Sequence, residues 1–167
     1  MKKTALLLAL FLTLSLFSSC ITNEHTSCRE ILDKIIISEV SLPAGQIYSS
    51  RAEKGENEYM SASLINSIYG NGTVPPMADG WIEVAIFLPS SSHPCEFAVF
   101  LCDSRDTAND TARMLCSRLD AIRTAKGTKD NMQMINSAEI AVVRNYVLFI
   151  LSSDSKNALK AAKKAMR

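Results

Sequence analysis

The fold is decided by two apolar stretches, Trp81-Ile82-Glu83-Val84-Ala85-Ile86-Phe87-Leu88 at residues 81–88 and Cys95-Glu96-Phe97-Ala98-Val99-Phe100-Leu101-Cys102 at residues 95–102. Both are rich in β-branched and aromatic residues, and the Pro- and Ser-rich segment 89–94 between them has the composition of a turn. The pattern predicts an antiparallel hairpin. A register with Leu88 opposite Cys95 would make one face of this hairpin wholly apolar.

In that register the second face of the hairpin carries Trp81, Phe87 and Phe100. If nothing covers these side chains, they form an aromatic patch, and exposed patches of this kind usually mark a binding site. The alternative is that apolar residues of the helices preceding the hairpin bury the patch, because those helices also need an apolar partner. Trp81, Phe87 and Phe100 are therefore a possible binding face.

Helical periodicity in the apolar residues predicts four helices, at residues 28–38, 58–69, 105–125 and 154–166. A second hairpin should turn at residues 144–145, with Val142 opposite Val147. After two initial helices the order is strand-strand-helix-strand-strand-helix. This order predicts an α+β domain with a four-stranded antiparallel sheet built from two hairpins. We expect the last two helices to cover its more apolar face.

The N-terminus has the layout of a bacterial lipoprotein signal. Lys2 and Lys3 precede an apolar run that is too short to span a bilayer comfortably, and Ser18 and Ser19 precede Cys20. We expect lipidation of Cys20, which would anchor the chain outside the cytoplasmic membrane. An ordinary secretion signal or an uncleaved anchor are the alternatives, and both would also export the domain. The expected organisation is a signal peptide (1–19), a lipidated tether (20–27) and one domain (28–167).

Charge excludes one class of partner and suggests another. The chain has 18 Lys and Arg against 17 Asp and Glu, so removing Lys2 and Lys3 leaves 16 against 17, a net charge of −1. This balance gives no reason to expect a nucleic-acid partner. Four cations do follow one stripe of the last predicted helix, Lys156, Lys160, Lys163 and Arg167. They are a possible contact with the membrane or with cell-wall polymer, or else a solvated helix face.

No motif for catalysis, nucleotide binding or metal binding is found in the remaining sequence. The two histidines, His25 and His93, fall in the tether and in a turn. With Cys28 and Cys95 they could supply four zinc ligands only if the tether folded onto the hairpin turn. Glu83 and Glu96 fall on one face in the proposed register, each opposite a phenylalanine, and make a weak carboxylate pair for glycoside hydrolysis. We therefore expect no cofactor and no metal.

Four cysteines remain if Cys20 is lipidated. Strand and helix geometry argue against bridges from Cys102 to Cys95 or Cys116. A disulfide would have to use Cys28 or join Cys95 to Cys116, and the alternative is that all four are buried free thiols.

Several short stretches carry a resemblance to a known family. They are Leu42-Pro43, Tyr48, Glu58-Tyr59-Met60-Ser61, Leu64, Tyr69-Gly70, Ala85-Ile86-Phe87 and Glu96-Phe97-Ala98-Val99-Phe100, followed by a helix rich in Arg and Leu. Over residues 28–152 the chain resembles a family of small lipoproteins from Gram-positive bacteria that consists of a domain of unknown function. The resemblance implies a lipid-anchored extracytoplasmic domain, and no functional residue beyond Cys20.

The sequence thus favours a lipid-anchored domain that binds or scaffolds an unknown protein or cell-wall partner without catalysis. A small envelope hydrolase with an unrecognised active site near residues 71–80, which we expect to form a mobile loop, is the alternative. A solute-binding lipoprotein is a third possibility, although one domain of this size lacks the two lobes that usually close around a solute.

Overall fold

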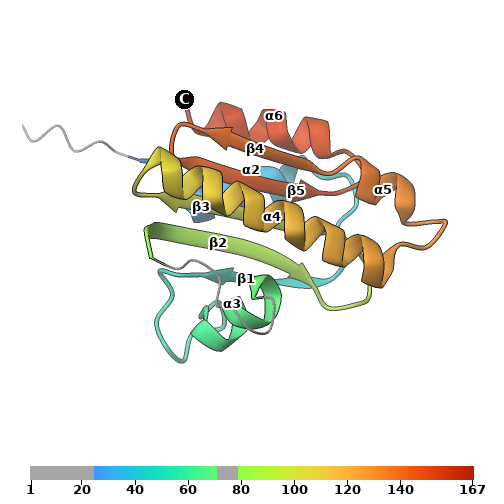
Figure 1. The fold of residues 1–167 in the computed structure, drawn as a ribbon, viewed down its shortest axis with the longest axis horizontal. Helices are drawn as coiled ribbons and strands as arrows, with labels where there is room; N and C mark the ends of the chain where they lie inside the picture. The colour runs from blue at the N-terminus through green and yellow to red at the C-terminus, as the bar shows by residue number, and fades with distance from the viewer. Residues whose placement is uncertain (1–24, 71–78) are drawn as a thin grey trace, which may run out of the picture.

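Five antiparallel strands form a single sheet that lies between two layers of helices (Figure 1). The computed structural model describes residues 25–70 and 79–167. The strands are β1 (Gly45–Ser49), β2 (Trp81–Pro89), β3 (Glu96–Cys102), β4 (Glu139–Val143) and β5 (Tyr146–Leu151), in the order β1-β2-β3-β5-β4 across the sheet. The predicted signal peptide, Cys20 and most of the predicted mobile loop lie outside the described residues.

The prediction of an α+β domain with an antiparallel sheet is confirmed, but the count of four strands was wrong. The missed strand, β1, pairs with β2 from Gly45 opposite Pro89 to Ser49 opposite Ala85. It escaped detection because it is short and follows a Pro- and Gly-containing segment typical of a chain break. Gly45 is required there, since a Cβ atom would come within 2.4 Å of the Phe87 ring.

The helices are α2 (Cys28–Ser38), α3 (Ala62–Tyr69), α4 (Arg105–Lys126), α5 (Met132–Asn136) and α6 (Ser155–Ala165). Ser27 caps α2 through a capping box in which Ser27 and Glu30 exchange two hydrogen bonds of 3.1 Å. Helix α3 starts later than predicted, because Glu58 accepts a hydrogen bond of 2.8 Å from the Ser49 backbone and stays beside β1. The short helix α5 was not predicted.

The predicted register of the first hairpin was wrong by one residue. Phe87 lies opposite Phe97 and Val84 lies opposite Phe100, with an irregularity between Trp81 and Glu83. Because successive residues of a strand alternate between the two faces of a sheet, a shift of one residue changes which side chains of the two strands share a face. The second hairpin has the predicted register, with Val142 opposite Val147.

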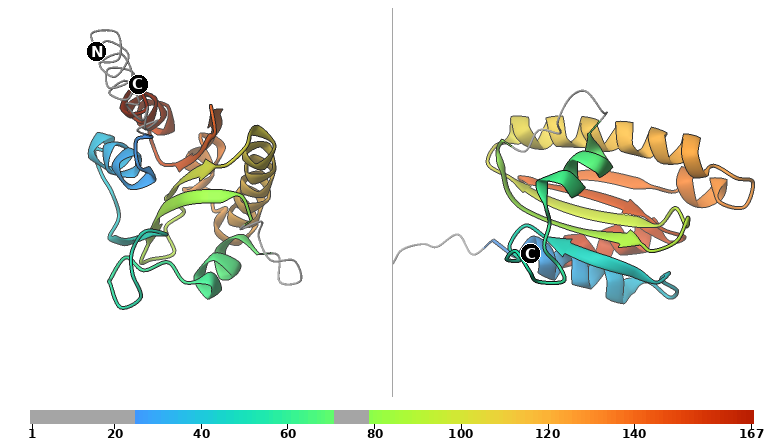
Figure 2. Two further views of the ribbon diagram at one scale, coloured as in Figure 1. Left: turned by 90° about the vertical axis from the view of Figure 1, so that its left-hand side faces the viewer. Right: turned by 90° about the horizontal axis from the view of Figure 1, so that it is seen from below.

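Both faces of the sheet are covered, as Figure 2 shows with α4 and α2 on opposite sides. Helices α2 and α6 pack on one face, whereas α3, α4 and α5 contribute to the apolar cluster on the other. The expectation that the last two helices share a face was therefore wrong. Every residue of β3 is buried, so its two apolar faces both require cover.

Candidate functional site

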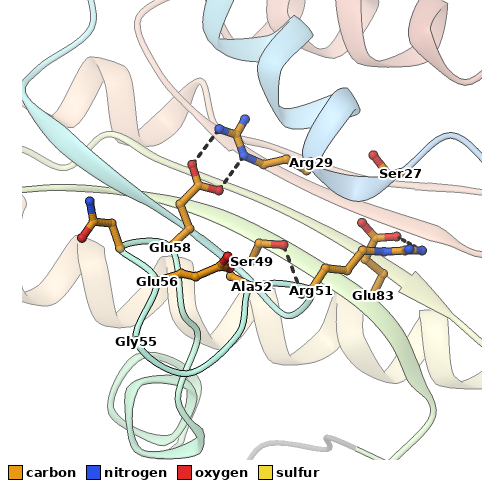
Figure 3. Close-up of a pocket in the computed structure, with 10 residues that line it drawn as sticks. Ser27, Arg29, Ser49, Arg51, Ala52, Gly55, Glu56, Glu58 and Glu83 are labelled. Atoms are coloured by element: carbon orange, nitrogen blue, oxygen red, sulfur yellow. Dashed lines mark hydrogen bonds and ion pairs between the residues drawn. The ribbon is translucent and has the colours of Figure 1, made fainter.

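A cleft of about 710 Å³ lies between the first turn of α2 and the loop that joins β1 to α3 (Figure 3). Its volume falls in the range of about 300–1,000 Å³ that small-molecule sites occupy. Its lining is polar and charged: Ser27, Arg29, Ser49, Arg51, Ala52, Gly55, Glu56, Asn57, Glu58 and Glu83.

Arg51 is placed in the cleft by the backbone that follows β1. The Ser50 amide donates to the Val84 carbonyl and the Ser50 hydroxyl accepts from the Val84 amide, both at 2.9 Å. These two bonds fix Ser50 beside β2, so the next residue, Arg51, lies alongside Glu83. Arg51 Nη2 is 2.8 Å from Glu83 Oε2.

The carboxylate of Glu83 is buried, with 1% of its side chain exposed, whereas the side chain of Arg51 is 68% exposed. Glu83 Oε1 accepts a hydrogen bond of 3.0 Å from the Cys28 amide at the start of α2, where the helix dipole favours a negative charge. A guanidinium carries five N–H donors, and the ion pair with Glu83 involves only one of the guanidinium nitrogens of Arg51. Arg51 therefore presents the rest of its guanidinium to the cleft.

Arg29 forms the opposite wall, and each of its three guanidinium nitrogens has a carboxylate partner. Its Nε and Nη2 donate to the two oxygens of Glu58 at 3.0 and 2.8 Å (Figure 3). Its Nη1 contacts Asp33. The hydrogen bonds between Arg29 and Glu58 lower the pKa of Glu58 and raise that of Arg29. This bidentate pair holds the loop against α2 and keeps the cleft in shape.

The cleft combines both signs of charge. Two guanidinium groups, of Arg29 and Arg51, share it with the carboxylates of Glu56, Glu58 and Glu83. After the Arg29–Glu58 and Arg51–Glu83 pairs are formed, the exposed carboxylate of Glu56 is left, and one of its oxygens accepts a backbone amide of its own loop at 2.8 Å. The site offers an exposed guanidinium and an exposed carboxylate to the same ligand.

The cleft is poorly equipped for nucleophilic catalysis. Burial, followed by the charge of Glu83, raises the pKa of the Cys28 thiol well above its usual range, so this thiol stays protonated at neutral pH. The hydroxyl oxygens of Ser27 and Ser49 accept backbone amides at 3.1 and 3.2 Å. Histidine is not among the described residues that line the cleft.

The three aromatic residues expected to form a binding face are not brought together. Phe87 packs toward α2 and α6, 5.7 Å from Phe97 between ring centroids, whereas Trp81 and Phe100 face the other layer, 4.9 Å apart. Phe87 and Phe100 are buried. The indole N–H of Trp81 donates to Thr111 at 2.8 Å. These residues belong to the core.

The glutamates of the hairpin are also separated, because Glu83 is opposite Leu101 and Glu96 is opposite Leu151 on the other face. The suggested carboxylate pair is not formed.

The four cations of the predicted stripe, Lys156, Lys160, Lys163 and Arg167, are all exposed on or just after α6. The four described cysteines are free thiols: Cys28, Cys95 and Cys102 are buried and Cys116 is exposed. Burial raises the pKa of Cys95 to about 12.

His25 and His93 do not approach each other as zinc ligands. His25 stacks edge-on to Tyr146, with ring centroids 6.4 Å apart, while His93 Nδ1 accepts the Cys95 amide at 3.1 Å. Within residues 25–70 and 79–167, no cluster of three or more His, Cys, Asp or Glu is placed to hold a metal ion.

Comparison with known proteins finds no matching family model, no matching curated protein and no matching solved structure. The resemblance to small Gram-positive lipoproteins thus stays a prediction. In the part of the chain that the structure describes, no helix has both the length and the hydropathy to cross a bilayer. The assignment of a function therefore depends on the geometry of the cleft.

Proposed function

We propose that this protein is a lipid-anchored binding domain on the outer side of the cytoplasmic membrane, and that its cleft binds a small zwitterion such as a short peptide. The observation that carries the proposal is the exposed guanidinium of Arg51, held from behind by the buried carboxylate of Glu83 and facing a wall that contains Glu56. The ion pair with Glu83 restricts the positions of the Arg51 guanidinium, which lowers the cost of ordering this side chain when a ligand binds.

In the proposed complex the ligand carboxylate accepts hydrogen bonds from Arg51, and its ammonium group lies against Glu56. Hydrogen bonds to charged groups contribute about 1.5–3 kcal/mol each. Two such contacts in an open, solvated cleft correspond to a Kd between roughly tens of micromolar and several millimolar.

Binding is favoured over the alternative of a small envelope hydrolase. Burial raises the pKa of the Cys28 thiol, which is not among the residues that line the cleft, and the hydroxyl oxygens of Ser27 and Ser49 each accept a hydrogen bond from a backbone amide. Nucleophilic catalysis needs a general base within hydrogen-bond reach of the nucleophile, and no imidazole lines the described part of the cleft.

The proposed anchor would place the cleft near the membrane. Ser27 lines the cleft and follows Cys20 by seven residues. A fully extended chain of that length reaches about 25 Å. A lipid on Cys20 would keep the site within that distance of the bilayer, where an envelope peptide or a cell-wall partner is met.

Isothermal titration tests the proposal with the mature chain from residue 20, carrying Cys20→Ser so that no lipid is attached. We expect Ala-Ala to bind saturably, and its N-acetylated and C-amidated forms to bind at least about tenfold more weakly. Equal binding of the blocked forms, or no binding of any, would contradict the proposal.

The variants Arg51→Gln and Glu56→Gln should each weaken Ala-Ala binding by at least about tenfold. Glu56 is exposed, so its variant tests the site without disturbing the core. Arg113→Gln is the matched control, because Arg113 is 76% exposed on α4, far along the chain from the cleft. The Arg113→Gln variant should bind Ala-Ala with the affinity of the parent chain.

A further inference from the structure

A second surface feature lies on the other flank of α2, where α2 and α6 run side by side. A groove of about 420 Å³ opens between them, lined by Lys34, Ile37, Ser38, Ala161, Lys164 and Ala165. Ile37 is 75% exposed, and Val40, two residues after the end of α2, is fully exposed. Among the described residues these two are the most exposed large apolar side chains.

The core does not need Ile37. Helix α2 already buries Ile31, Leu32 and Ile35 completely. Ile37 is two residues after Ile35, which at 100° per residue places it on the outward side of the helix. Its exposure is therefore a property of the surface and not a defect in the packing of α2.

The lining of the groove is cationic, because it contains Lys34 and Lys164 and no acidic side chain, although the exposed Glu30 lies one turn before Lys34 on α2. Helix α6 contains four lysines and no acidic residue between Ser155 and Ala165. Lys34 lines the groove from α2 and Lys164 lines it from α6, and Lys160 lies one turn before Lys164 on the same row of α6. A second copy of this chain is a poor occupant, since a two-fold contact would set lysines against lysines. An anionic surface is complementary.

The chain leading from the proposed anchor is fixed to the same layer. The Thr26 hydroxyl donates to the Ala165 carbonyl at 3.1 Å, and the Tyr146 hydroxyl donates to the Thr26 carbonyl at 2.6 Å. Thr26 follows Cys20 by six residues, so the end of α6 would lie within about 22 Å of the lipid.

We infer that the α2–α6 face docks on an anionic bilayer, with Ile37 and Val40 entering the headgroup region and Lys34, Lys160 and Lys164 contacting anionic headgroups. The inference uses the proposed envelope location but not the cleft. Lys156, Lys163 and Arg167 lie farther round α6 and add long-range attraction. Because Arg29 and Lys34 are on opposite flanks of α2, docking leaves the cleft open.

Vesicle co-sedimentation tests the inference with the mature chain carrying Cys20→Ser. We expect binding to vesicles that contain phosphatidylglycerol, weakening with salt, and much weaker binding to pure phosphatidylcholine. Ile37→Ser with Val40→Ser should reduce binding at least about tenfold, and Lys34→Gln with Lys164→Gln should do the same.

Control variants test whether vesicle binding depends on the α2–α6 face itself or on any exposed apolar or charged side chain. Ile82→Ser removes another exposed apolar side chain, and Lys129→Gln removes an exposed charge elsewhere. Both should bind vesicles like the parent chain. Binding that survives the Ile37 and Val40 changes, or no binding to anionic vesicles, would overturn the inference. Dimerisation abolished by Ile37→Ser would also overturn it, by assigning the face to a second copy.

The outcomes are independent of the cleft. The groove variants should titrate Ala-Ala with the affinity of the parent chain, and Glu56→Gln should bind vesicles normally. A failure of vesicle binding with intact peptide binding would reject the docking face alone.

Discussion

Glu83 and Glu96 are buried carboxylates on adjacent strands, and each meets one arginine, yet the two arginines differ in exposure. Arg118 is 21% exposed and makes three contacts with Glu96, at 3.2, 3.2 and 2.7 Å. Arg51 is 68% exposed and approaches Glu83 through one contact of 2.8 Å. We call the Glu96–Arg118 pair closed, because its arginine is largely buried, and the Glu83–Arg51 pair open, because its arginine is largely exposed.

The elements that carry the two arginines explain the difference. Arg118 belongs to the long helix α4, which covers the sheet, so its whole guanidinium is laid against Glu96. Burial alone would lower the pKa of Arg118, but the hydrogen bonds to Glu96 and the negative charge of Glu96 act together against it, and the pKa is raised. Arg51 belongs to a loop, which leaves one side of its guanidinium in the cleft. The closed pair therefore serves stability, and the open pair is available to a ligand.

The largest expected effect comes from breaking the closed pair. Arg118→Ala leaves the Glu96 carboxylate buried without its cationic partner, which typically costs about 3–5 kcal/mol in the free energy of unfolding. Urea unfolding followed by circular dichroism measures it.

The double variant Glu96→Leu with Arg118→Leu is the control. It removes both charges and should recover most of the lost stability. A loss below about 1 kcal/mol for Arg118→Ala would mean that the pair contributes no more than a surface salt bridge.

Breaking the open pair should cost less. Arg51→Ala uncovers Glu83 to the cleft, where water can replace the guanidinium, while the Cys28 amide still donates to the other oxygen. We expect a loss of about 1–2 kcal/mol in the free energy of unfolding, measured in the same way. A loss equal to that of Arg118→Ala would contradict the distinction between an open and a closed pair.

The sequence predicted the elements better than their arrangement. The start of α2 at Cys28, the start of α4 at Arg105 and the register of the second hairpin follow from local signals that the structure confirms. The register of the first hairpin failed because both faces of β2 and β3 are apolar. Apolar pairing then looks acceptable in either register, so it does not discriminate between them.

The cleft was missed for a related reason. Arg29, Arg51 and Glu58 are dispersed in the sequence and meet only because β1 joins the edge of the sheet, a strand that the pattern did not reveal. One local signal was present: Glu83 is a charge within an otherwise apolar strand. A charge at such a position needs a partner.

The smallest expected effect concerns the Arg29–Glu58 pair that holds the loop of the cleft against α2, and this effect depends on pH. The hydrogen bonds from Arg29 lower the pKa of Glu58, so the ionised carboxylate is favoured in the folded state. Its contribution to stability is complete above the unfolded pKa of a glutamate, about 4.3, and is lost as the pH falls through the lower folded value. Glu58→Gln should therefore flatten the acid side of the pH–stability profile and leave the profile above neutral pH parallel to that of the parent chain.

Urea midpoints measured across this range check the expectation, and Asp130→Asn, at an exposed site, is the control. If Glu58→Gln left the pH dependence of stability in acid unchanged, the Arg29–Glu58 pair would not act through the charge of Glu58. The shape of the cleft would then depend on the backbone hydrogen bonds of the loop.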